Sequence, residues 1–354
     1  MDLTLTAEQR LLVESARATL GRVCPPSHVR AMEADARGYD PALWRDMARL
    51  GWTGILIDEE EGGSAQSLLE AVLLLEEMGR VLLPAPFLAT GVIVPVLLRA
   101  LAERRWLRAI AAGELVATPA LVEPGWRDEW GALACTFRDG TVSGTKCFVP
   151  FAASADVVLV VTTGPRLVAV EGRAQVACER QQTLGGDLQY AVRFDRAAGV
   201  DLGPVGHALE RARLHAVVGG LAYAVGAAER ALEITVEYAK TRVQFGRPIG
   251  SFQAVAHRCA DMRSDVDALR YLVYQAAWSL AAGRPSELEV GVAKAFGNEA
   301  LRRVFMHAHQ VHGAIGFSTE HDLQLFTRRA KAIELAWGSA SAHRERVARA
   351  MGLG

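Results

Sequence analysis

Two long helical patterns in the last third of the chain, separated by a short break, constrain the fold most strongly. They cover residues 209–240 and 252–282, and each is apolar on more than one face. Helices of this length and pattern bury their apolar faces against one another, as helical bundles do. Shorter helical patterns follow at residues 286–309, 322–336 and 341–351. We therefore expect residues 205–354 to form a C-terminal domain built on a four-helix bundle.

A smaller set of helical patterns occupies the first third of the chain. Thr6 precedes the first apolar run and Gln9 follows three residues later, which is the arrangement of a capping box at a helix N-terminus. Helical periodicity recurs at residues 39–50, 67–80, 87–101 and 104–112. Prolines and glycines interrupt it at Pro25–Pro26, Gly62–Gly63 and Pro84. These patterns predict an N-terminal α-helical domain over residues 1–114.

The middle of the chain, residues 115–204, has the pattern of a β domain. Short runs of β-branched and apolar residues cover 115–122, 132–137, 141–149, 156–162, 166–170 and 189–194. Runs of this length and composition are typical of strands. Asp139–Gly140 lies between two of them and is a hairpin signal. We expect an antiparallel, barrel-like domain that ends near Gly203–Pro204, and hence an α+β fold for the whole chain.

The charge balance excludes some classes of partner. Lys and Arg number 39 against 40 Asp and Glu in 354 residues, so the net charge is −1. Nucleic acids and anionic membrane surfaces attract strongly basic proteins, so we expect neither as a partner. The most apolar segment, residues 81–101, contains Pro84, Pro86 and Pro95 and no run long enough to span a bilayer. We expect a cytoplasmic protein without membrane insertion.

The cysteines and histidines indicate neither a disulfide framework nor a metal site. The five cysteines are odd in number, widely spaced and without CxxC pairs. His307, His309 and His312 lie close together, but their pattern lacks the spacing and carboxylate support of metal ligands. We expect a reduced protein whose histidines are structural or solvated.

The break between the two long helical patterns carries the strongest functional signal. Its glycines, proline, cation, amides and aromatics are Arg242, Gln244, Phe245, Gly246, Pro248, Gly250, Phe252 and Gln253. A guanidinium binds phosphate well, and amides hydrogen-bond to planar polar groups. The ordinary alternative is a cation at the end of a helix beside aromatic core anchors. The combination favours a loop that binds an anionic group, most simply a phosphate.

Two motifs give this loop a context. The first is Tyr238-Ala-Lys-Thr-Arg-Val-Gln-Phe-Gly-Arg-Pro-Ile-x-x-Phe-Gln253 with His257, and the second is Gln310-Val-His-Gly-Ala-Ile-Gly-Phe-x-Thr-Glu320. With helical, β and helical domains in this order, the chain resembles the FAD-dependent acyl-CoA dehydrogenases over essentially its whole length. The resemblance implies an oxidoreductase that introduces an α,β double bond into an acyl-CoA thioester.

The resemblance also implies that FAD is held at an interface between subunits. Arg242 would pair with the pyrophosphate, and Gln310 with the Gly313 backbone would hold the cofactor from the partner subunit. The expected cofactor-binding residues are Arg242, Gln244, Phe245, Gln253, Gln310, Gly313, Ala314 and Ser339. For Gln310 and Gly313 alone, the alternative is a helix that ends at its glycine.

The chemistry of the family needs a glutamate that removes the α-proton of the substrate while the β-hydride passes to the flavin. Trp337 stands at the common position of that residue, and Ala216 stands at the alternative position. The nearest acids, Glu334 and Glu210, lie three and six residues upstream. Glu334 has the pattern of an ordinary helix carboxylate, and Glu210 aligns only with an insertion. The catalytic residue is therefore unknown.

The β domain departs from the family pattern as well. The family carries Trp-x-Thr beside the flavin, and the matching segment here is Lys146-Cys-Phe-Val-Pro150. Pro150 has neither a hydroxyl nor an N–H group, so a hydrogen bond to the flavin is lost at this position. Of the usual acyl-contacting loop, Val122-Glu-Pro124 survives and is followed by the unrelated residues 125–130.

Three functions stay open. The favoured one is a subunit of a hetero-oligomeric acyl-CoA dehydrogenase, in which this chain completes the FAD interface and a partner supplies the glutamate. Such assemblies are known in the family for bulky acyl groups such as sterol side chains. The second is a self-sufficient homo-oligomeric enzyme with an unrecognised base, and the third is a non-enzymatic scaffold. The expected partners are an acyl-CoA substrate, an electron-transfer flavoprotein or similar acceptor, and further subunits in a homo- or hetero-dimer or tetramer.

Overall fold

The computed structural model describes residues 4–125, 133–172 and 176–353. Tertiary contacts group these residues into two compact units. Unit 1 draws on Met1–Val29, Val72–Leu83 and Val217–Gly354, and unit 2 draws on Arg30–Ala71 and Pro84–Ala216. The long helix α7 (Gly206–Thr241) contributes residues to both units. The division into segments 1–114, 115–204 and 205–354 stays a prediction.

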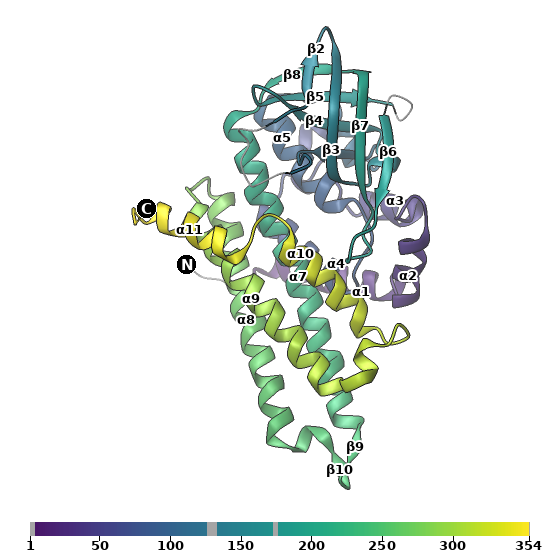
Figure 1. The fold of residues 1–354 in the computed structure, drawn as a ribbon, viewed down its shortest axis with the longest axis vertical. Helices are drawn as coiled ribbons and strands as arrows, with labels where there is room; N and C mark the ends of the chain where they lie inside the picture. Colours follow the sequence, from purple (N-terminus) through teal and green to yellow (C-terminus); the bar gives the residue numbers. More distant parts are fainter. Residues whose placement is uncertain (1–3, 126–132, 173–175, 354) are drawn as a thin grey trace. The chain divides into compact units, whose positions relative to one another are not determined.

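Unit 1 is helical (Figure 1). Its helices are α1 (Ala7–Val23), most of α4 (Leu68–Arg80), the larger part of α7, α8 (Gln253–Ala281), α9 (Glu287–His312), α10 (Leu323–Leu335) and α11 (Ala340–Ala350). A 3₁₀ turn, η7 (Gly313–Phe317), follows α9. The predicted C-terminal helical bundle is confirmed. Among the helices that the structure describes, none is both long and apolar enough to cross a membrane.

The start of α1 is capped as its sequence indicates. The Oγ1 of Thr6 accepts the N–H of Gln9 at 3.2 Å, and the Oε1 of Gln9 accepts the N–H of Thr6 at 3.0 Å. The next helix, α2 (Pro26–Ala34), was not expected, because Pro25–Pro26 has the pattern of a break. Pro26 is instead the first residue of that helix, where its missing N–H has no intrahelical partner to lose and its fixed φ suits the first turn.

The helices α4 and α7 approach each other closely at two glycines. A Cβ atom on Gly226 would lie 1.8 Å from the carbonyl oxygen of Glu76, and one on Gly79 would lie 1.9 Å from that of Tyr223. Cβ atoms do not approach backbone oxygens to such distances, so both positions require glycine. The backbone-to-backbone contact sets how deeply α4 packs against α7 within unit 1.

Two four-stranded sheets form the centre of unit 2 (Figure 1). The first has the order β1-β4-β5-β8 and the second has the order β2-β3-β7-β6. The strands are β1 (Ala117–Ala120), β2 (Thr136–Arg138), β3 (Thr141–Pro150), β4 (Val157–Thr162), β5 (Arg166–Glu171), β6 (Val176–Gln181), β7 (Gln189–Ala198) and β8 (Val200–Pro204). All pairs are antiparallel except β1 with β4. The predicted β domain is confirmed, and its described strands form two sheets instead of a closed barrel.

The β2–β3 hairpin turns at Asp139 and Gly140, where the sequence predicted a turn. Asp139 and Gly140 have φ angles of 49° and 71°, which are the left-handed values that a two-residue hairpin loop requires. Two strands, β6 and β8, were not expected. The sequence of β6, Val-Ala-Cys-Glu-Arg-Gln, is largely polar, and it is an edge strand that pairs only with β7. Its conformation comes from that pairing more than from its own residues.

The helical segments of unit 2 are short. Apart from the first residues of α4 and α7, they are the larger part of α2, α3 (Pro41–Arg49), the 3₁₀ turn η1 (Glu59–Glu61), the π-helix η2 (Phe87–Ile93), α5 (Val94–Ala100), α6 (Leu107–Ala111) and the 3₁₀ turn η4 (Ala152–Ser154). The sequence indicated one continuous helix over residues 87–101. The structure divides it into η2 and α5 near Pro95, which has no N–H group to donate to an α-helical ladder.

We predict that Gly226→Ala destabilises the protein strongly, because the added methyl group overlaps the Glu76 carbonyl and α4 must move away. The expected loss in unfolding free energy is about 3 kcal/mol or more. Gly220→Ala is the matched control in the same helix, since the nearest atom to its Cβ is 3.8 Å away. Alanine there should stabilise α7 by about 0.5–1 kcal/mol. Urea unfolding followed by circular dichroism measures both, and equal effects would contradict the proposed contact.

Candidate functional site

The loop between α7 and α8 is a tight hairpin (Figure 1, lower end). Its strands are β9 (Val243–Gln244) and β10 (Arg247–Pro248), and the 3₁₀ turn η6 (Ile249–Ser251) leads into α8. Phe245 and Gly246 form the tip with φ angles of 54° and 77°. Two successive left-handed residues define the usual two-residue hairpin turn. For an aromatic residue this conformation is uncommon, so the tip is a specialised element.

The hairpin exposes an aromatic side chain and a cation. The Phe245 side chain is 92% exposed at the tip. Its ring meets that of Phe252 edge-on at 6.0 Å, and the guanidinium of Arg247 lies 4.1 Å from the centre of the Phe252 ring. Within the described residues, no carboxylate pairs with the guanidinium of Arg242. The hairpin therefore presents one engaged arginine and one arginine that is free to bind an anion.

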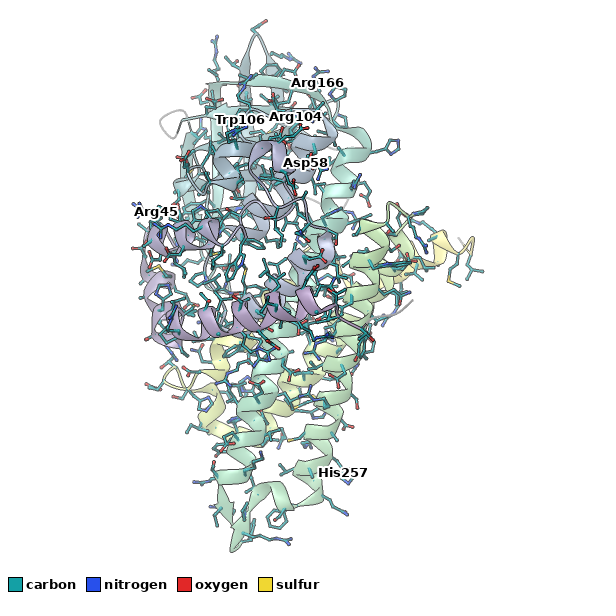
Figure 2. The ribbon with its side chains drawn as sticks, turned by 180° about the vertical axis from the view of Figure 1, so that it is seen from behind. Arg45, Asp58, Arg104, Trp106, Arg166 and His257 are labelled. Atoms are coloured by element: carbon teal, nitrogen blue, oxygen red, sulfur yellow. The ribbon has the colours of Figure 1, made fainter. Side chains whose placement is uncertain are left out.

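The amides of the first motif lie on the same exposed loop. Gln244 bonds the backbone oxygen of Val243 at 2.8 Å, and Gln253 is the first residue of α8 with an exposed side chain. His257, one turn further along α8, is exposed and projects outward (Figure 2). The structure thus places the polar residues of this motif at the surface of one end of unit 1.

The second motif lies at the end of α9. Gly313 follows the helix with φ +66°, and a Cβ atom there would have no neighbour within 4 Å. Gln310, Gly313 and Ala314 are exposed. The ring of His312 stacks on that of Tyr238 with centroids 4.6 Å apart. Because Tyr238 begins the first motif, this stack brings the two motifs together in unit 1.

The position expected for the base lies between α10 and α11. Trp337 has φ +63° and Gly338 has φ +106°, so the chain reverses sharply here. Ser339 caps α11, since its Oγ accepts the N–H of Ala342 at 3.2 Å. Trp337 is partly buried. An indole has no group that can accept the α-proton of a thioester, so residue 337 does not act as a base.

Buried polar side chains hold this connection in place. Lys294 donates to the carbonyl oxygens of Ile333 and Glu334 at 2.7 and 3.2 Å. Asn298 donates to the oxygen of Gly338 at 3.2 Å, and Nε2 of His343 lies 2.8 Å from that of Trp337. The side chains of Lys294, Asn298 and His343 are all buried. The backbone around Trp337 is therefore held by Lys294 and Asn298, which are far from it in the sequence, and by the nearby His343.

The two nearby acids are engaged in ion pairs. Glu334 is buried and bonds Arg302 and Lys331, each at 2.8 Å. Burial alone raises the pKa of a carboxyl, but the bonds from Arg302 and Lys331 outweigh it and hold the pKa of Glu334 below its usual value. Glu210 is paired with Arg213 one turn further along α7. Both acids are poor general bases, since a carboxylate stabilised by a cation accepts protons weakly.

In unit 2, the strand β3 ends with Phe148, Val149 and Pro150. Phe148 has φ +52° and a side chain that is 56% exposed, and its N–H donates to Gln181 at 2.7 Å. The carbonyl oxygen of Pro150 accepts the hydroxyl of Thr118 at 2.6 Å. Pro150 has no N–H to offer a ligand. The end of this strand therefore exposes the ring of Phe148, and Pro150 stands where the family pattern has a threonine.

A buried ion pair in unit 2 escaped the sequence analysis. The Nζ of Lys146 lies 2.7 Å from Glu123, and both side chains are buried. Glu123 also accepts the N–H groups of Ala134 and Cys135 at 2.6 and 3.1 Å. Burial lowers the pKa of Lys146, whereas Lys146 and the N–H donors lower the pKa of Glu123 against its own burial. Residues 126–130, expected to replace the acyl-contacting loop, lie outside the described ranges.

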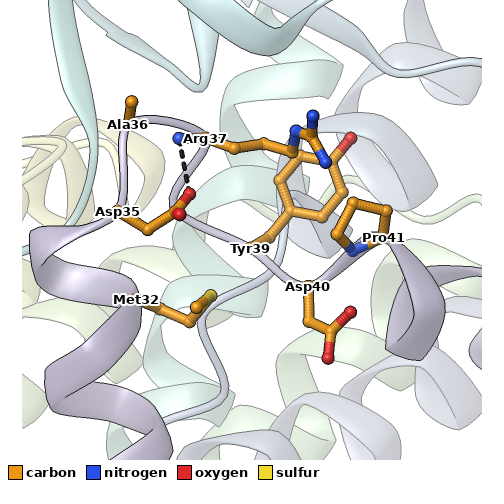
Figure 3. A pocket seen from close by; sticks show the side chains of 7 residues that line it. All are labelled: Met32, Asp35, Ala36, Arg37, Tyr39, Asp40 and Pro41. Atoms are coloured by element: carbon orange, nitrogen blue, oxygen red, sulfur yellow. Dashed lines mark hydrogen bonds between the residues drawn. The ribbon is translucent and has the colours of Figure 1, made fainter.

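Two hollows of the structure lie away from the two motifs. Figure 3 shows one of about 330 Å³ in unit 2, lined by Met32, Asp35, Ala36, Arg37, Tyr39, Asp40 and Pro41. Asp35 accepts the N–H of Arg37 there at 2.7 Å, which shapes the loop. A hollow of similar size in unit 1 lies among α1, α4, α7 and α10, where Glu77 holds Arg17 at 2.6 Å. Nowhere in the described chain do three or more His, Cys, Asp or Glu side chains gather as metal ligands.

Comparison with known proteins identifies the same helical domains at the two ends of the chain. Residues 6–114 match the acyl-CoA dehydrogenase N-terminal domain and residues 205–352 match the acyl-CoA dehydrogenase C-terminal domain. The chain is 33% identical over 330 residues to acyl-CoA dehydrogenase IpdE2 of Mycolicibacterium smegmatis, which covers 92% of this chain and 93% of that protein.

Two solved structures are similar over almost their whole length. The ChsE4–ChsE5 complex of Mycobacterium tuberculosis aligns with a TM-score of 0.88 at 29% identity and covers 100% of both chains. A variant of the Tcur3481–Tcur3483 steroid ACAD aligns with a TM-score of 0.90 at 30% identity and covers 99% of both chains. The chain belongs to the acyl-CoA dehydrogenase family. The family is FAD-dependent, which confirms FAD as the expected cofactor.

We predict that Lys294→Met destabilises the protein by about 1–3 kcal/mol, because two buried carbonyl oxygens at the end of α10 lose their donor. Lys331→Met is the control, since Lys331 is 39% exposed and its pairing with Glu334 contributes about 1 kcal/mol or less. Chemical unfolding of both variants gives the two free energies. A Lys294→Met variant as stable as the control would show that the connection at Trp337 does not depend on this side chain.

Proposed function

We propose that this chain is the FAD-interface subunit of a hetero-oligomeric acyl-CoA dehydrogenase, and that a partner subunit supplies the catalytic glutamate. The reaction is the α,β-desaturation of an acyl-CoA thioester. The observation that carries the proposal is that two features occur together. Arg242, on an exposed hairpin, has no carboxylate partner among the described residues, and residue 337 is a tryptophan. The chain retains the residues expected to hold FAD, and it has a tryptophan where the catalytic glutamate is expected.

The residues of the two motifs fit one arm of FAD. Arg242 supplies a free guanidinium for the pyrophosphate, and the open backbone at Gly313 allows close approach of a ligand. Phe245 would cover bound cofactor and exclude water from it. When bound, FAD supplies the acceptor for the substrate hydride. The residues proposed to hold it are Arg242, Gln244, Phe245, Gln253, Gln310, Gly313, Ala314 and Ser339.

The ion pairs of the two nearby glutamates argue against a self-sufficient enzyme. Glu334 and Glu210 are the acids nearest to the two base positions, and each is held by a cation. Ala216, at the second base position, is fully buried and has no polar group. A glutamate on a partner subunit would fill the missing role without any change in this chain. The retained motif residues argue against a pure scaffold, because a scaffold needs no free guanidinium at this loop.

The relatives support an assembly of unlike chains. One similar structure is a complex of ChsE4 with ChsE5, and another is a variant of the Tcur3481–Tcur3483 steroid ACAD. We infer by this likeness that the partner is a homologous subunit with a catalytic glutamate. The acyl group would be that of a fatty acid or a sterol side chain. An electron-transfer flavoprotein or similar acceptor would reoxidise the flavin.

The first test of this proposal is co-expression. The lone chain should purify with little FAD and show no turnover of acyl-CoA, since it lacks a base. Co-expression with a homologous, glutamate-bearing subunit should give a stable complex with flavin absorbance and turnover. The control replaces the partner's glutamate by glutamine, which should abolish turnover and leave the flavin spectrum. Stoichiometric FAD together with turnover by the lone chain would refute the proposal.

The second test concerns the hairpin. Arg242→Ala should weaken FAD binding to the complex by about 30-fold or more, because a charge-assisted bond to a phosphate contributes roughly 2 kcal/mol. Arg247→Ala removes an equal charge from the same hairpin, but its guanidinium already lies over Phe252. It should change FAD affinity much less. Fluorescence titration of apo-complex with FAD measures both, and matching losses would overturn the assignment of Arg242.

A further inference from the structure

Histidine side chains gather between the two motifs in unit 1. The His312 ring lies 4.9 Å from the His321 ring, with the planes at 66°. The His309 ring stacks on that of Phe317 at 4.2 Å. A Cβ atom on Gly316 would lie 3.1 Å from Nδ1 of His309, so the η7 turn packs directly on this cluster. We call His309, His312 and His321 the histidine cluster.

The hydrogen bonds of the cluster suit neutral rings. Nδ1 of His312 lies 2.8 Å from the oxygen of Ala308, and Nε2 of His309 lies 2.8 Å from the hydroxyl of Thr327. Nδ1 of His321 accepts the N–H of Leu323 at 3.2 Å, which requires this nitrogen to be unprotonated. Each nitrogen that already accepts a hydrogen bond loses that bond when it is protonated.

The remaining ring nitrogens have no acceptor. Nε2 of His312 and Nδ1 of His309 are buried and have no hydrogen-bond partner within the described ranges. Protonation of either ring adds a buried N–H group that nothing accepts, and such a group costs about 1–3 kcal/mol. Charging the cluster is therefore opposed by hydrogen bonding as well as by burial.

The electrostatic surroundings oppose protonation too. Burial lowers the pKa of both His309 and His312, and for His312 it outweighs the bond from Nδ1 to the oxygen of Ala308, which acts in the opposite direction. In the described chain, the other charges that shift these two values are those of the cluster itself: His321 acts on His312, and His312 and His321 act on His309. Facing groups on the adjoining elements are Tyr238 on α7, Phe317 on η7 and Thr327 on α10. None of these three side chains is an acid; Glu320 and Asp322 flank His321 in the chain, and neither is among the groups that shift the pKa of His309 or His312.

The cluster sits where both motifs depend on it. His312 lies two residues after Gln310 and directly before Gly313, and its ring stacks on Tyr238 near the end of α7. Tyr238 precedes Arg242 by one helical turn. Movement of the His312 ring therefore disturbs the α9 terminus and the base of the hairpin together.

We propose that the histidine cluster is a proton-sensitive latch, which holds the α9 terminus against the end of α7 at neutral pH and releases it in mild acid. The part of this inference that concerns FAD rests on the proposed function, whereas the latch itself is a property of unit 1. Protonation of the rings favours an open state in which they reach water and the turn from Gln310 to Phe317 separates from Tyr238.

The direction of the pH effect follows from the lowered pKa values. In the open state His309 and His312 titrate near the ordinary histidine pKa of about 6.5, whereas in the closed state their lowered pKa keeps them neutral to lower pH. Stability of the closed state is thus complete above about pH 6.5 and is lost as the pH falls below it. At pH 5.5 the open state gains up to about tenfold in relative population for each histidine that it alone protonates.

Hydrogen–deuterium exchange of the apo chain tests the latch without FAD. Between pH 7.5 and 5.5, with labelling times corrected for intrinsic exchange, protection of residues 310–317 should fall by up to about tenfold per released histidine. His312→Phe keeps a ring against Tyr238 and removes the titrating group, so it should lose most of this pH dependence. His321→Gln removes the second charge and should reduce the dependence as well. His207→Gln, an exposed site at the start of α7 in unit 2, should leave it unchanged.

The outcomes separate the latch from the cofactor assignment. Exchange in residues 310–317 that does not respond to pH, or that responds as strongly in His312→Phe and His321→Gln as in the wild type, overturns the latch even if FAD binds normally. In the co-expressed complex, release of FAD should accelerate over the same pH range in the wild type and less in His312→Phe. A latch that responds to pH in a complex without FAD would leave this inference standing and contradict the cofactor proposal instead.

Discussion

The bonds of Arg270 determine how the helices of unit 1 are placed. On α8, Arg270 donates to Glu76 of α4 at 2.9 Å and to Glu229 of α7 at 2.7 Å, and Tyr274 donates to Glu76 at 2.8 Å. These carboxylates are buried, and together they raise the pKa of Arg270 although burial opposes this. Removing one partner would leave a buried charge, at a cost of about 3–5 kcal/mol. Loss of any member would therefore shift three helices at once.

This network has a direct consequence for the candidate site. Both helices that carry the hairpin, α7 and α8, are joined through Glu229 and Arg270, so the hairpin extends from a fixed pair. The connection at Trp337 is held separately, by Lys294 and His343. A fold built in this way can keep its hairpin whichever residue stands at position 337. The family fold is therefore compatible with a chain that supports chemistry performed elsewhere, because fold and catalytic residue are separable.

Local signals allowed much of the fold to be predicted. The helices of unit 1 follow from periodicity and caps, and the turn at Asp139–Gly140 follows from the need for left-handed residues. Elements whose conformation depends on partners were missed, such as β6, which pairs with β7, and α2, whose Pro26 looked like a break. The β1–β4 pair is parallel, a feature that no run of residues reveals.

The sequence by itself determined the family and the two motifs, and it predicted that both base positions are replaced, because these depend only on which residue occupies each place. The tertiary structure decided which polar groups meet. Glu334 lies beside Arg302, Lys146 lies beside Glu123, and Lys294 reaches the carbonyl of Ile333. It also stacked His312 on Tyr238 and brought His321 to the same place. Such contacts join residues far apart in the chain, and local periodicity carries no information about them.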